Sequence, residues 1–246
     1  MFALMLATGP ASAHFQELIP STPIVTQATG PLIGLNLTFT HPMERGPVMP
    51  MGEPVRFGVL GPDGLADLKS LLHPAEPDDR RTYTAEYRVQ APGDYIFFVE
   101  PAPYWDAAEG AWIIHYTKLV VDAYGPAQGW GAELGLPVEI APLTRPYGLW
   151  TGNLFRGVVK RGGTPAPFAR VEVEWHNDGS MSPPSDPYVT QMVKADANGV
   201  FAYAIPRAGW WGFAALLEGD SLPGPSGEPA TVELGGLIWV HARDMR

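Results

Sequence analysis

Apolar and polar residues alternate along much of this chain, and a period of two is typical of half-buried β-strands. Residues 83–89 (YTAEYRV) alternate in this way, and the strongest pattern lies at residues 111–121 (AWIIHYTKLVV). There, one face of the predicted strand carries Trp112, Ile114, Tyr116 and Lys118, and the other carries Ile113, His115 and Thr117. No stretch predicts a helix of ordinary length, so the sequence predicts an all-β protein.

A Gly/Pro-rich connection between residues 123 and 145 divides the predicted strands into two groups. In the first group, a Pro-Gly turn before the apolar strand at 91–99 (APGDYIFFV) resembles the closing strand pair of an immunoglobulin-like sandwich. In the second group, the elements GxV, GxPxxxAxVxV, ADxNGxF and GxxxFxA resemble a transthyretin-like or carboxypeptidase-regulatory sandwich. We therefore expect two β-sandwich domains, at residues 14–140 and 141–246.

Composition limits the chemistry that this chain can perform. With 28 glycines and 27 prolines among 246 residues, the strands should be short, and no apolar run is long enough to span a membrane. The formal net charge of −10 argues against nucleic acid as a partner and is compatible with a cationic ligand. The absence of cysteine excludes disulfides and thiolate zinc sites, which leaves histidine, methionine and carboxylates as metal donors.

Residues 1–13 (MFALMLATGPASA) predict a signal peptide. A short apolar run precedes Ala11-Ser12-Ala13, which fits the small-x-small pattern of a cleavage site. No Lys or Arg precedes the run, a departure from ordinary signal peptides that a start further upstream would explain. Cleavage after Ala13 would make His14 the first residue of an exported, periplasmic protein.

Residues 41–51 (HPMERGPVMPM) concentrate potential metal donors in one loop. The loop offers the imidazole of His41, with the side chains of Met43, Glu44, Met49 and Met51 as optional further ligands. Prolines at positions 42, 47 and 50 keep the backbone out of a helix. A surface loop whose methionines fill a nearby core would give the same pattern, so the loop alone does not decide between the two interpretations.

Two more histidines favour a metal site. After cleavage, His14 could chelate one ion through its α-amine and ring Nδ1, since the amine has a reference pKa of about 7.7–8.0. His115 lies in the middle of a predicted strand, where a histidine is more often a core residue than a ligand. Together, His14, His41 and His115 would form a nitrogen-rich site suited to Ni²⁺, Co²⁺, Cu²⁺ or Zn²⁺ and unsuited to Ca²⁺ or Mg²⁺. His73, His176 and His241 are expected to be structural or exposed.

The sequence contains no G-x-S-x-G, P-loop, HExxH or dinucleotide-binding motif, so we do not expect an ordinary enzyme. Two alternatives to metal capture stay open. One is a copper-dependent oxidative enzyme that uses an N-terminal histidine chelate. The other is a metal-free adhesive or glycan-binding β module with exposed aromatic residues.

Several segments together resemble a known family. HPMERGPVMPM, IIHYTKLVV, TRPYGLWTGNLFRGVV, VEVEW and ADANGVFAYAIPRAGWWGFAAL resemble the periplasmic nickel-uptake transporter family, over nearly the whole chain after residue 13. Members are secreted proteins of two β domains, classed as a domain of unknown function and associated with nickel/cobalt transporters of the energy-coupling-factor type. The resemblance implies capture of Ni²⁺, or of Co²⁺, in the periplasm and delivery to inner-membrane transporter components. Its motifs fall on His41 and His115, and His14 matches a histidine expected just after the cleavage site.

Overall fold

The computed structural model describes residues 14–76 and 79–245, so the predicted signal peptide lies outside the described residues. The described part folds almost entirely into β-strands, with two short 3₁₀ helices and no α-helix. The predicted all-β fold is therefore confirmed. No helix in this part of the chain is long and apolar enough to cross a bilayer.

In the first half, the described residues form ten strands and one 3₁₀ helix. They are β1 (Phe15–Pro20), β2 (Ile24–Val25), β3 (Leu32–Thr40), β4 (Arg56–Gly61), β5 (Gly64–Asp67), η1 (Lys69–Leu71), β6 (His73–Glu76), β7 (Asp79–Arg88), β8 (Gly93–Glu100), β9 (Tyr104–Asp106) and β10 (Ala111–Ala123).

The second half contains the other ten strands and the second 3₁₀ helix. They are β11 (Val138–Pro142), β12 (Leu149–Trp150), β13 (Leu154–Arg161), β14 (Thr164–Pro165), β15 (Arg170–Trp175), η2 (Asp186–Tyr188), β16 (Gln191–Lys194), β17 (Val200–Ala204), β18 (Gly209–Glu218), β19 (Leu222–Pro223) and β20 (Pro229–Arg243).

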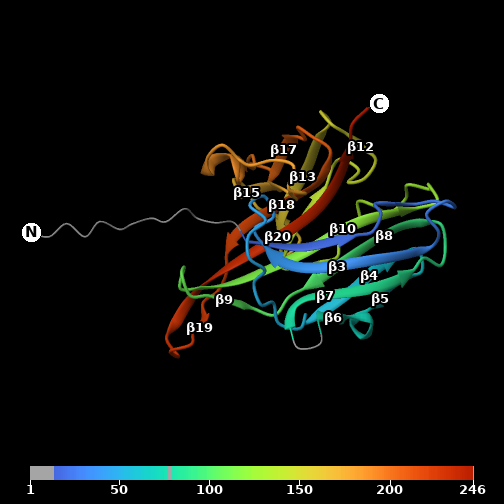
Figure 1. Cartoon of the computed structure of the whole chain (residues 1–246). Coiled ribbons are helices and arrows are strands. Elements are labelled where there is room, and N and C mark those ends of the chain that lie inside the picture. The colour runs from blue at the N-terminus through green and yellow to red at the C-terminus, as the bar shows by residue number, and fades with distance from the viewer. Residues whose placement is uncertain (1–13, 77–78, 246) are drawn as a thin grey trace, which may run out of the picture.

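One long sheet joins the two halves (Figure 1). Its main path runs β16-β15-β18-β20-β10-β8-β4-β5, so the last strand of the chain pairs with a strand of the first half. A four-stranded sheet, β1-β3-β7-β6, covers the first-half strands of the long sheet, and a sheet of β11, β13, β14 and β17 covers the second-half strands. The predicted domain boundary near residue 140 stays a prediction. Strands from both sides of that residue pair within the long sheet.

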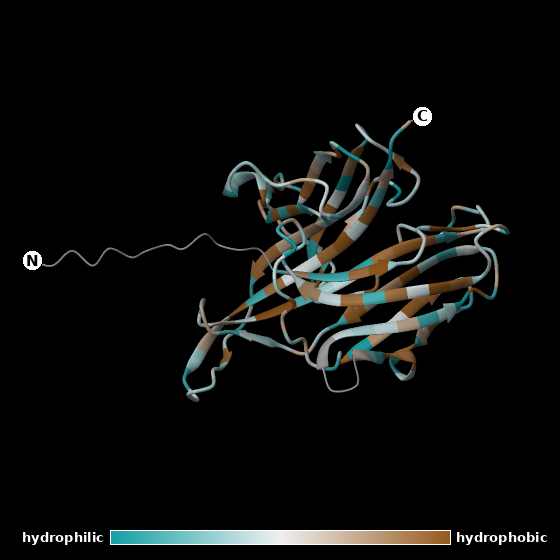
Figure 2. Ribbon diagram, in the orientation of Figure 1, coloured by the Kyte–Doolittle hydropathy of each residue, from teal (hydrophilic) through white to brown (hydrophobic). Residues whose placement is uncertain are grey.

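Alternate residues of β20 contribute to two different cores. Leu237 and Trp239 belong to the core of the first sandwich, whereas Ile238 and Val240 belong to the core of the second. The two small sheets therefore pack on opposite faces of the long sheet, because successive side chains of a strand point to opposite faces. Alternating apolar and polar bands along the strands are visible in Figure 2. β20 is thus the structural link between the sandwiches.

A local feature supports the immunoglobulin-like reading of the first sandwich. The hydroxyl of Tyr95, near the start of β8, donates a hydrogen bond of 2.8 Å to the carbonyl oxygen of Ala91. A tyrosine that bonds back to the preceding corner in this way is typical of immunoglobulin-like sandwiches. The predicted turn at 91–93 is therefore held by the strand that follows it.

Candidate metal centre

Strand pairing brings His14 and His41 together. β1 and β3 are antiparallel with Phe15 opposite Thr40, so the residue before β1 lies beside the residue after β3. The ring centroids of His14 and His41 are 4.7 Å apart. His14 is buried and His41 is half-buried. This corner of the first sandwich thus holds two of the three predicted ligands.

The hairpin of β9 and β10 adds two carboxylates to this corner. Nε2 of His14 lies 3.0 Å from Oδ2 of Asp106, and both side chains are largely buried. The other oxygen, Oδ1, accepts hydrogen bonds from the backbone N–H groups of Ala108 (2.7 Å) and Glu109 (3.1 Å), which fix the carboxylate. One ligand atom each from His14, Asp106 and Glu109 lie within 4.8 Å of one another. His41 and His115 lie outside that compact group.

His115 forms a second imidazole–carboxylate pair. It lies on the face of β10 that the alternation predicted, and its side chain is 1% exposed. Nε2 of His115 lies 3.0 Å from Oε1 of Glu233, a residue of β20 that is 118 positions away in sequence. Nδ1 is buried without any hydrogen-bond partner. A buried polar atom without a partner is costly, so this nitrogen points to a ligand.

Gly235 makes room for the ring of His115. β10 and β20 are parallel here, with His115 opposite Gly235. A Cβ atom on Gly235 would lie only 2.4 Å from Cδ2 of His115. A glycine inside a strand often marks such a close approach. Gly235 therefore allows the pairing of His115 with Glu233.

Burial, assisted by the neighbouring histidines, keeps the ring of His14 neutral. Its pKa is lowered to about 4, first by burial and then by His41 and His115, while Asp106 and Glu233 act in the opposite direction. At pH 7, Nε2 can donate its proton to Asp106, which leaves the lone pair on Nδ1. His41 and His115 thus both act on His14 and lower its pKa.

Two aromatic rings fill the space among the histidines. The ring of Phe39 stacks on His14 at 5.6 Å and meets His115 edge-on at 5.9 Å, between centroids. Tyr104 lies 5.1 Å from Phe39 and 6.1 Å from His14. Phe39 is the next-to-last residue of β3, and His41 follows the last one. An apolar wall of this kind limits water around the imidazoles and strengthens their electrostatic interactions.

The methionines of the 41–51 loop lie in hydrophobic cores. Met49 and Met51 belong to the core of the first sandwich, and Met43 belongs to that of the second. Sulfur of Met51 accepts a contact of 3.7 Å from the amide of Gln16, and Glu44 is exposed. We therefore leave these four optional ligands out of the proposed donor set.

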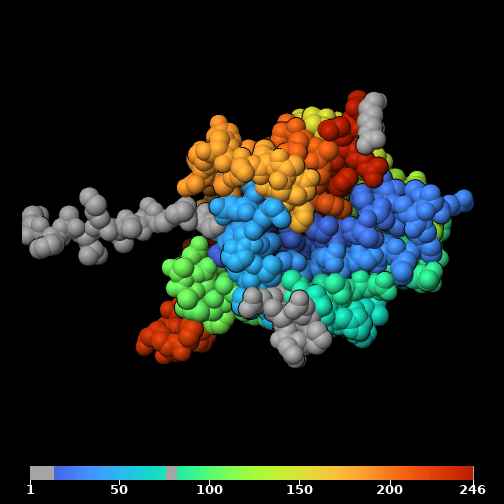
Figure 3. Space-filling model, viewed as in Figure 1, coloured from blue at the N-terminus to red at the C-terminus, as the bar shows by residue number. Residues whose placement is uncertain are grey.

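The 41–51 loop also joins the two halves of the molecule. The N–H of Met43 donates to Oε2 of Glu174 at 3.0 Å, and the N–H of Asn177 donates to the carbonyl of Pro42 at 3.3 Å. In the space-filling view, the light-blue segment that contains the loop lies between the orange part of the second half and the green hairpin of β9 and β10 (Figure 3). The loop thus positions His41 through packing and backbone contacts.

Sequence reasoning missed the carboxylates Asp106, Glu109 and Glu233. Asp106 and Glu109 lie in a short polar turn, which resembles any solvated loop. Glu233 meets His115 only through the parallel pairing of β10 with β20, and no local pattern predicts that pairing. The pair of glycines at 235 and 236 within an apolar strand was the available signal for a close approach.

The other three described histidines have different neighbours. His73 is exposed on β6. Nδ1 of His176 lies 2.7 Å from Oε1 of Glu17, and this hydrogen bond raises the pKa of His176. The ring of His241 packs edge-on against Trp210 at 4.9 Å. His73 is exposed, and His176 and His241 are half-buried.

Comparison with known proteins identifies a family but no activity. The profile of a family described as a domain of unknown function (DUF4198) matches residues 11–219. No curated protein matches the sequence.

The solved structures that match this chain are distant from it. They include a Ca²⁺-stabilised ice-binding adhesin of an Antarctic bacterium (11% identity, 90% of this chain, 46% of that chain, TM-score 0.21). A 1.5-MDa bacterial ice-binding adhesin matches at 8% identity over 94% of this chain and 65% of that one, with a TM-score of 0.25. The FN1–FN3 domains of chicken CNTN1 match at 9% identity over 93% of this chain and 65% of that one, with a TM-score of 0.21. The chain thus spans less than two thirds of each, and such low scores carry no inference about function.

Proposed function

This chain belongs to the DUF4198 family, and we propose that it is an exported protein that captures Ni²⁺ in the periplasm and supports its uptake by an inner-membrane transporter. Co²⁺ is the alternative cargo. The observation that carries the proposal is the meeting of His14 with His41, Asp106 and Glu109 in one corner, next to the unpartnered Nδ1 of His115. Nickel is the cargo of this protein, and no catalysis is required.

Two carboxylates orient the proposed ligands in the same way. Asp106 and Glu233 each hold Nε2 of one imidazole at 3.0 Å, which leaves Nδ1 of His14 and of His115 for a metal ion. Ligating histidines nearly always donate their other N–H group to such a partner. In the mature protein the α-amine of His14 would complete a chelate with its own Nδ1. His41 would supply the third imidazole, and Glu109 an oxygen ligand.

A groove of about 350 Å³ next to His115 offers a route for the cation. Its lining includes Glu109, Glu218 and Glu233, with Arg170 as the basic residue. Negative side chains raise the local concentration of a divalent cation. Because Glu109 belongs both to this groove and to the group around His14, the cation could pass from one carboxylate to the imidazoles.

The donor set favours a divalent ion over Cu⁺. Thioether sulfur is the side-chain donor that selects Cu⁺, and the three loop methionines lie in the cores. Imidazole and carboxylate suit Ni²⁺, Co²⁺ and Zn²⁺, and they also suit Cu²⁺. The nearness of His14 to His41 is compatible with the copper-dependent oxidative alternative, so the experiment must include it.

Calorimetric titration of two proteins that differ by one residue tests the proposal. One protein begins at His14 with a free α-amine, and the other keeps Ala13 in front of it. We expect one Ni²⁺ site in the first protein and binding at least tenfold weaker in the second. Equal binding in both would remove the α-amine from the site.

The same two proteins also distinguish the alternative functions, through metal titration and a peroxide assay. No binding of Ni²⁺, Co²⁺, Cu²⁺ or Zn²⁺ in either protein would overturn metal capture. Peroxide formation that requires Cu²⁺ and a reductant, and that is absent with Ni²⁺, would favour the oxidative enzyme. The Ala13-extended protein is the matched control, because it contains every described residue.

A further inference from the structure

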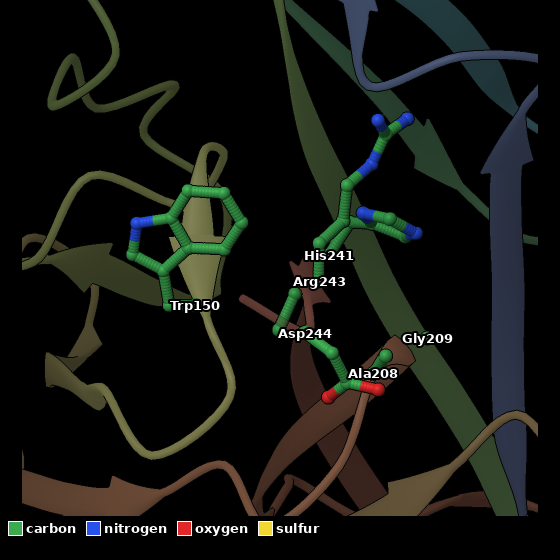
Figure 4. Close-up of a pocket in the computed structure, with 7 residues that line it drawn as sticks. Trp150, Ala208, Gly209, His241, Arg243 and Asp244 are labelled. Carbon is green, nitrogen blue, oxygen red and sulfur yellow. The ribbon is translucent and has the colours of Figure 1, made fainter. Parts of the chain in front are cut away.

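A second candidate binding site lies at the carboxyl end of β20 and shares no residue with the metal centre. It is a groove of about 720 Å³, lined by Trp150, His241, Arg243, Asp244 and the segment 208–209 (Figure 4). Its volume falls in the range of about 300–1,000 Å³ that is typical of small-molecule sites. A further hollow of about 480 Å³ is also lined by Trp150, His241 and Arg243, and it continues to the hydroxyl-bearing residues Thr22, Thr26 and Thr29.

Strand register places the key side chains on one face of the long sheet. Trp150 is opposite Arg243 in the parallel pairing of β12 with β20, and Trp210 is opposite His241 in the antiparallel pairing of β18 with β20. His241 and Arg243 are two positions apart on one strand, so their side chains project to the same side. Figure 4 shows the indole of Trp150 across from His241 and Arg243. The site is therefore built on strands.

Each of these side chains is available to a ligand. Trp150 is 43% exposed, although a large indole is ordinarily packed away from water. The guanidinium of Arg243 has no hydrogen-bond or ion-pair partner among the described residues, in a protein whose net charge is −10. Asp244 is held in place by a hydrogen bond of 2.6 Å from the hydroxyl of Thr151.

We propose that this groove binds an acidic polysaccharide through a uronate residue. The apolar C–H face of a sugar ring packs on an indole, and a planar guanidinium binds a carboxylate through two parallel hydrogen bonds. A ring nitrogen of His241 can donate a hydrogen bond to a sugar hydroxyl or accept one from it, and the carboxylate of Asp244 can accept one. The two hollows share Trp150, His241 and Arg243, and the second also offers threonine hydroxyls, so together they suit several linked sugars better than a single compact ligand.

Electrophoresis of the full chain through gels that contain polygalacturonate tests this inference. The matched gel contains dextran, which is neutral, and both gels contain EDTA so that metal bound to the polymer plays no part. We expect retardation in the polygalacturonate gel at 0.15 M salt (about the physiological value), against the overall repulsion between two anions. Trp150→Ala and Arg243→Gln should each weaken apparent binding at least tenfold, and Arg161→Gln, at an exposed arginine of β13, should bind as the unaltered chain does.

Three results would overturn the inference. They are an unaltered chain that is not retarded by polygalacturonate, retardation that both variants retain in full, and equal retardation in dextran. Thermal unfolding of each variant distinguishes a lost contact from a lost fold. Trp150→Ala should keep the melting temperature within a few degrees, because β12 is held by backbone pairing with β20. The outcome is independent of metal binding, since EDTA is present throughout.

Discussion

Strand β10 carries two buried bases, three positions apart, whose surroundings differ in one respect. Lys118 pairs with Glu139 at 2.5 Å, and that carboxylate also accepts backbone N–H groups from Leu134 and Gly135. His115 pairs with Glu233 on the other face of the strand, but its Nδ1 has no partner. In the first pair every buried side-chain nitrogen and oxygen has at least one hydrogen-bond partner, whereas in the second Nδ1 of His115 has none.

This difference separates a structural pair from a candidate ligand. Burial lowers the pKa of Lys118, whereas Glu139 raises it. The buried ammonium therefore depends on the carboxylate of Glu139 to stay charged. Burial raises the pKa of Glu233, but His115 and Arg170 bring it below its ordinary value, so this carboxylate stays ionised and orients the imidazole. Burial does not distinguish the two bases, whereas the unsatisfied Nδ1 of His115 does.

The largest expected effect comes from Lys118→Met. It leaves Glu139 buried without its cation and should lower the free energy of unfolding by about 3–5 kcal/mol. Urea unfolding measures the loss, and Ni²⁺ affinity of the folded variant should not change. The matched control is Lys160→Met, which removes a more exposed ion pair with Glu133 and should cost less than about 1 kcal/mol. Equal losses in the two variants would contradict the structural role of Lys118.

His115→Phe should have the opposite effect, with little loss of stability and a large loss of Ni²⁺ affinity. A phenyl ring has a similar volume, so the free energy of unfolding should change by less than about 1.5 kcal/mol. Ni²⁺ affinity should fall about a hundredfold, equivalent to about 2.7 kcal/mol. Calorimetry measures the affinity, and His73→Gln, at an exposed histidine, is the control. Unchanged Ni²⁺ binding in His115→Phe would make His115 a core residue.

Glu233→Gln sharpens the comparison, because it removes the charge of the orienting carboxylate and keeps its shape. Ni²⁺ affinity should fall about 10–100-fold, as is usual when a carboxylate partner of a ligating histidine is altered. Glu218 lies opposite Glu233 in the pairing of β18 with β20 and lines the same groove. Glu218→Gln removes the same charge without touching His115, so an equal loss in both would indicate attraction by charge alone.

The last prediction concerns Glu174, a buried carboxyl without an ion-pair partner among the described residues. Burial raises its pKa to about 8, although Thr190 and the N–H of Met43 lower it. Between its ordinary pKa of 4.5 and about 8, only the folded state keeps the proton, so stability should fall as pH rises through that window. The slope should reach about 1.4 kcal/mol per pH unit.

Glu174→Gln tests this slope, because an amide cannot ionise and still accepts the hydrogen bond from Met43. Urea unfolding at pH 5, 6.5 and 8 (about the edges and middle of that window) should show a flatter dependence in the variant than in the unaltered chain. Parallel dependences in the two proteins would show that Glu174 ionises in the folded state like an ordinary carboxyl.

Local patterns predicted much of the fold. The alternation at 111–121 assigned His115 and Lys118 to opposite faces of β10, and the structure confirms this. The all-β class also followed from the sequence. The parallel pairing of β10 with β20 did not, because it joins residues more than a hundred positions apart and depends on both sandwiches at once.

The candidate site was predictable only in part. The sequence singled out His14, His41 and His115, and β1–β3 pairing brings the first two together. It could not show that Met43, Met49 and Met51 fill cores, since a thioether serves equally as ligand and as packing. Nor could it identify the carboxylates that orient the rings, because their partners come from other strands.

Anomalous X-ray diffraction at the nickel absorption edge tests the central claim most directly. Crystals of the protein that begins at His14 would be soaked with one equivalent of Ni²⁺. We predict one strong peak at the corner of His14 and His41, on the Nδ1 side of His115, with no methionine sulfur in contact. A strongest peak at His176 or His241, or no peak at all, would contradict the account.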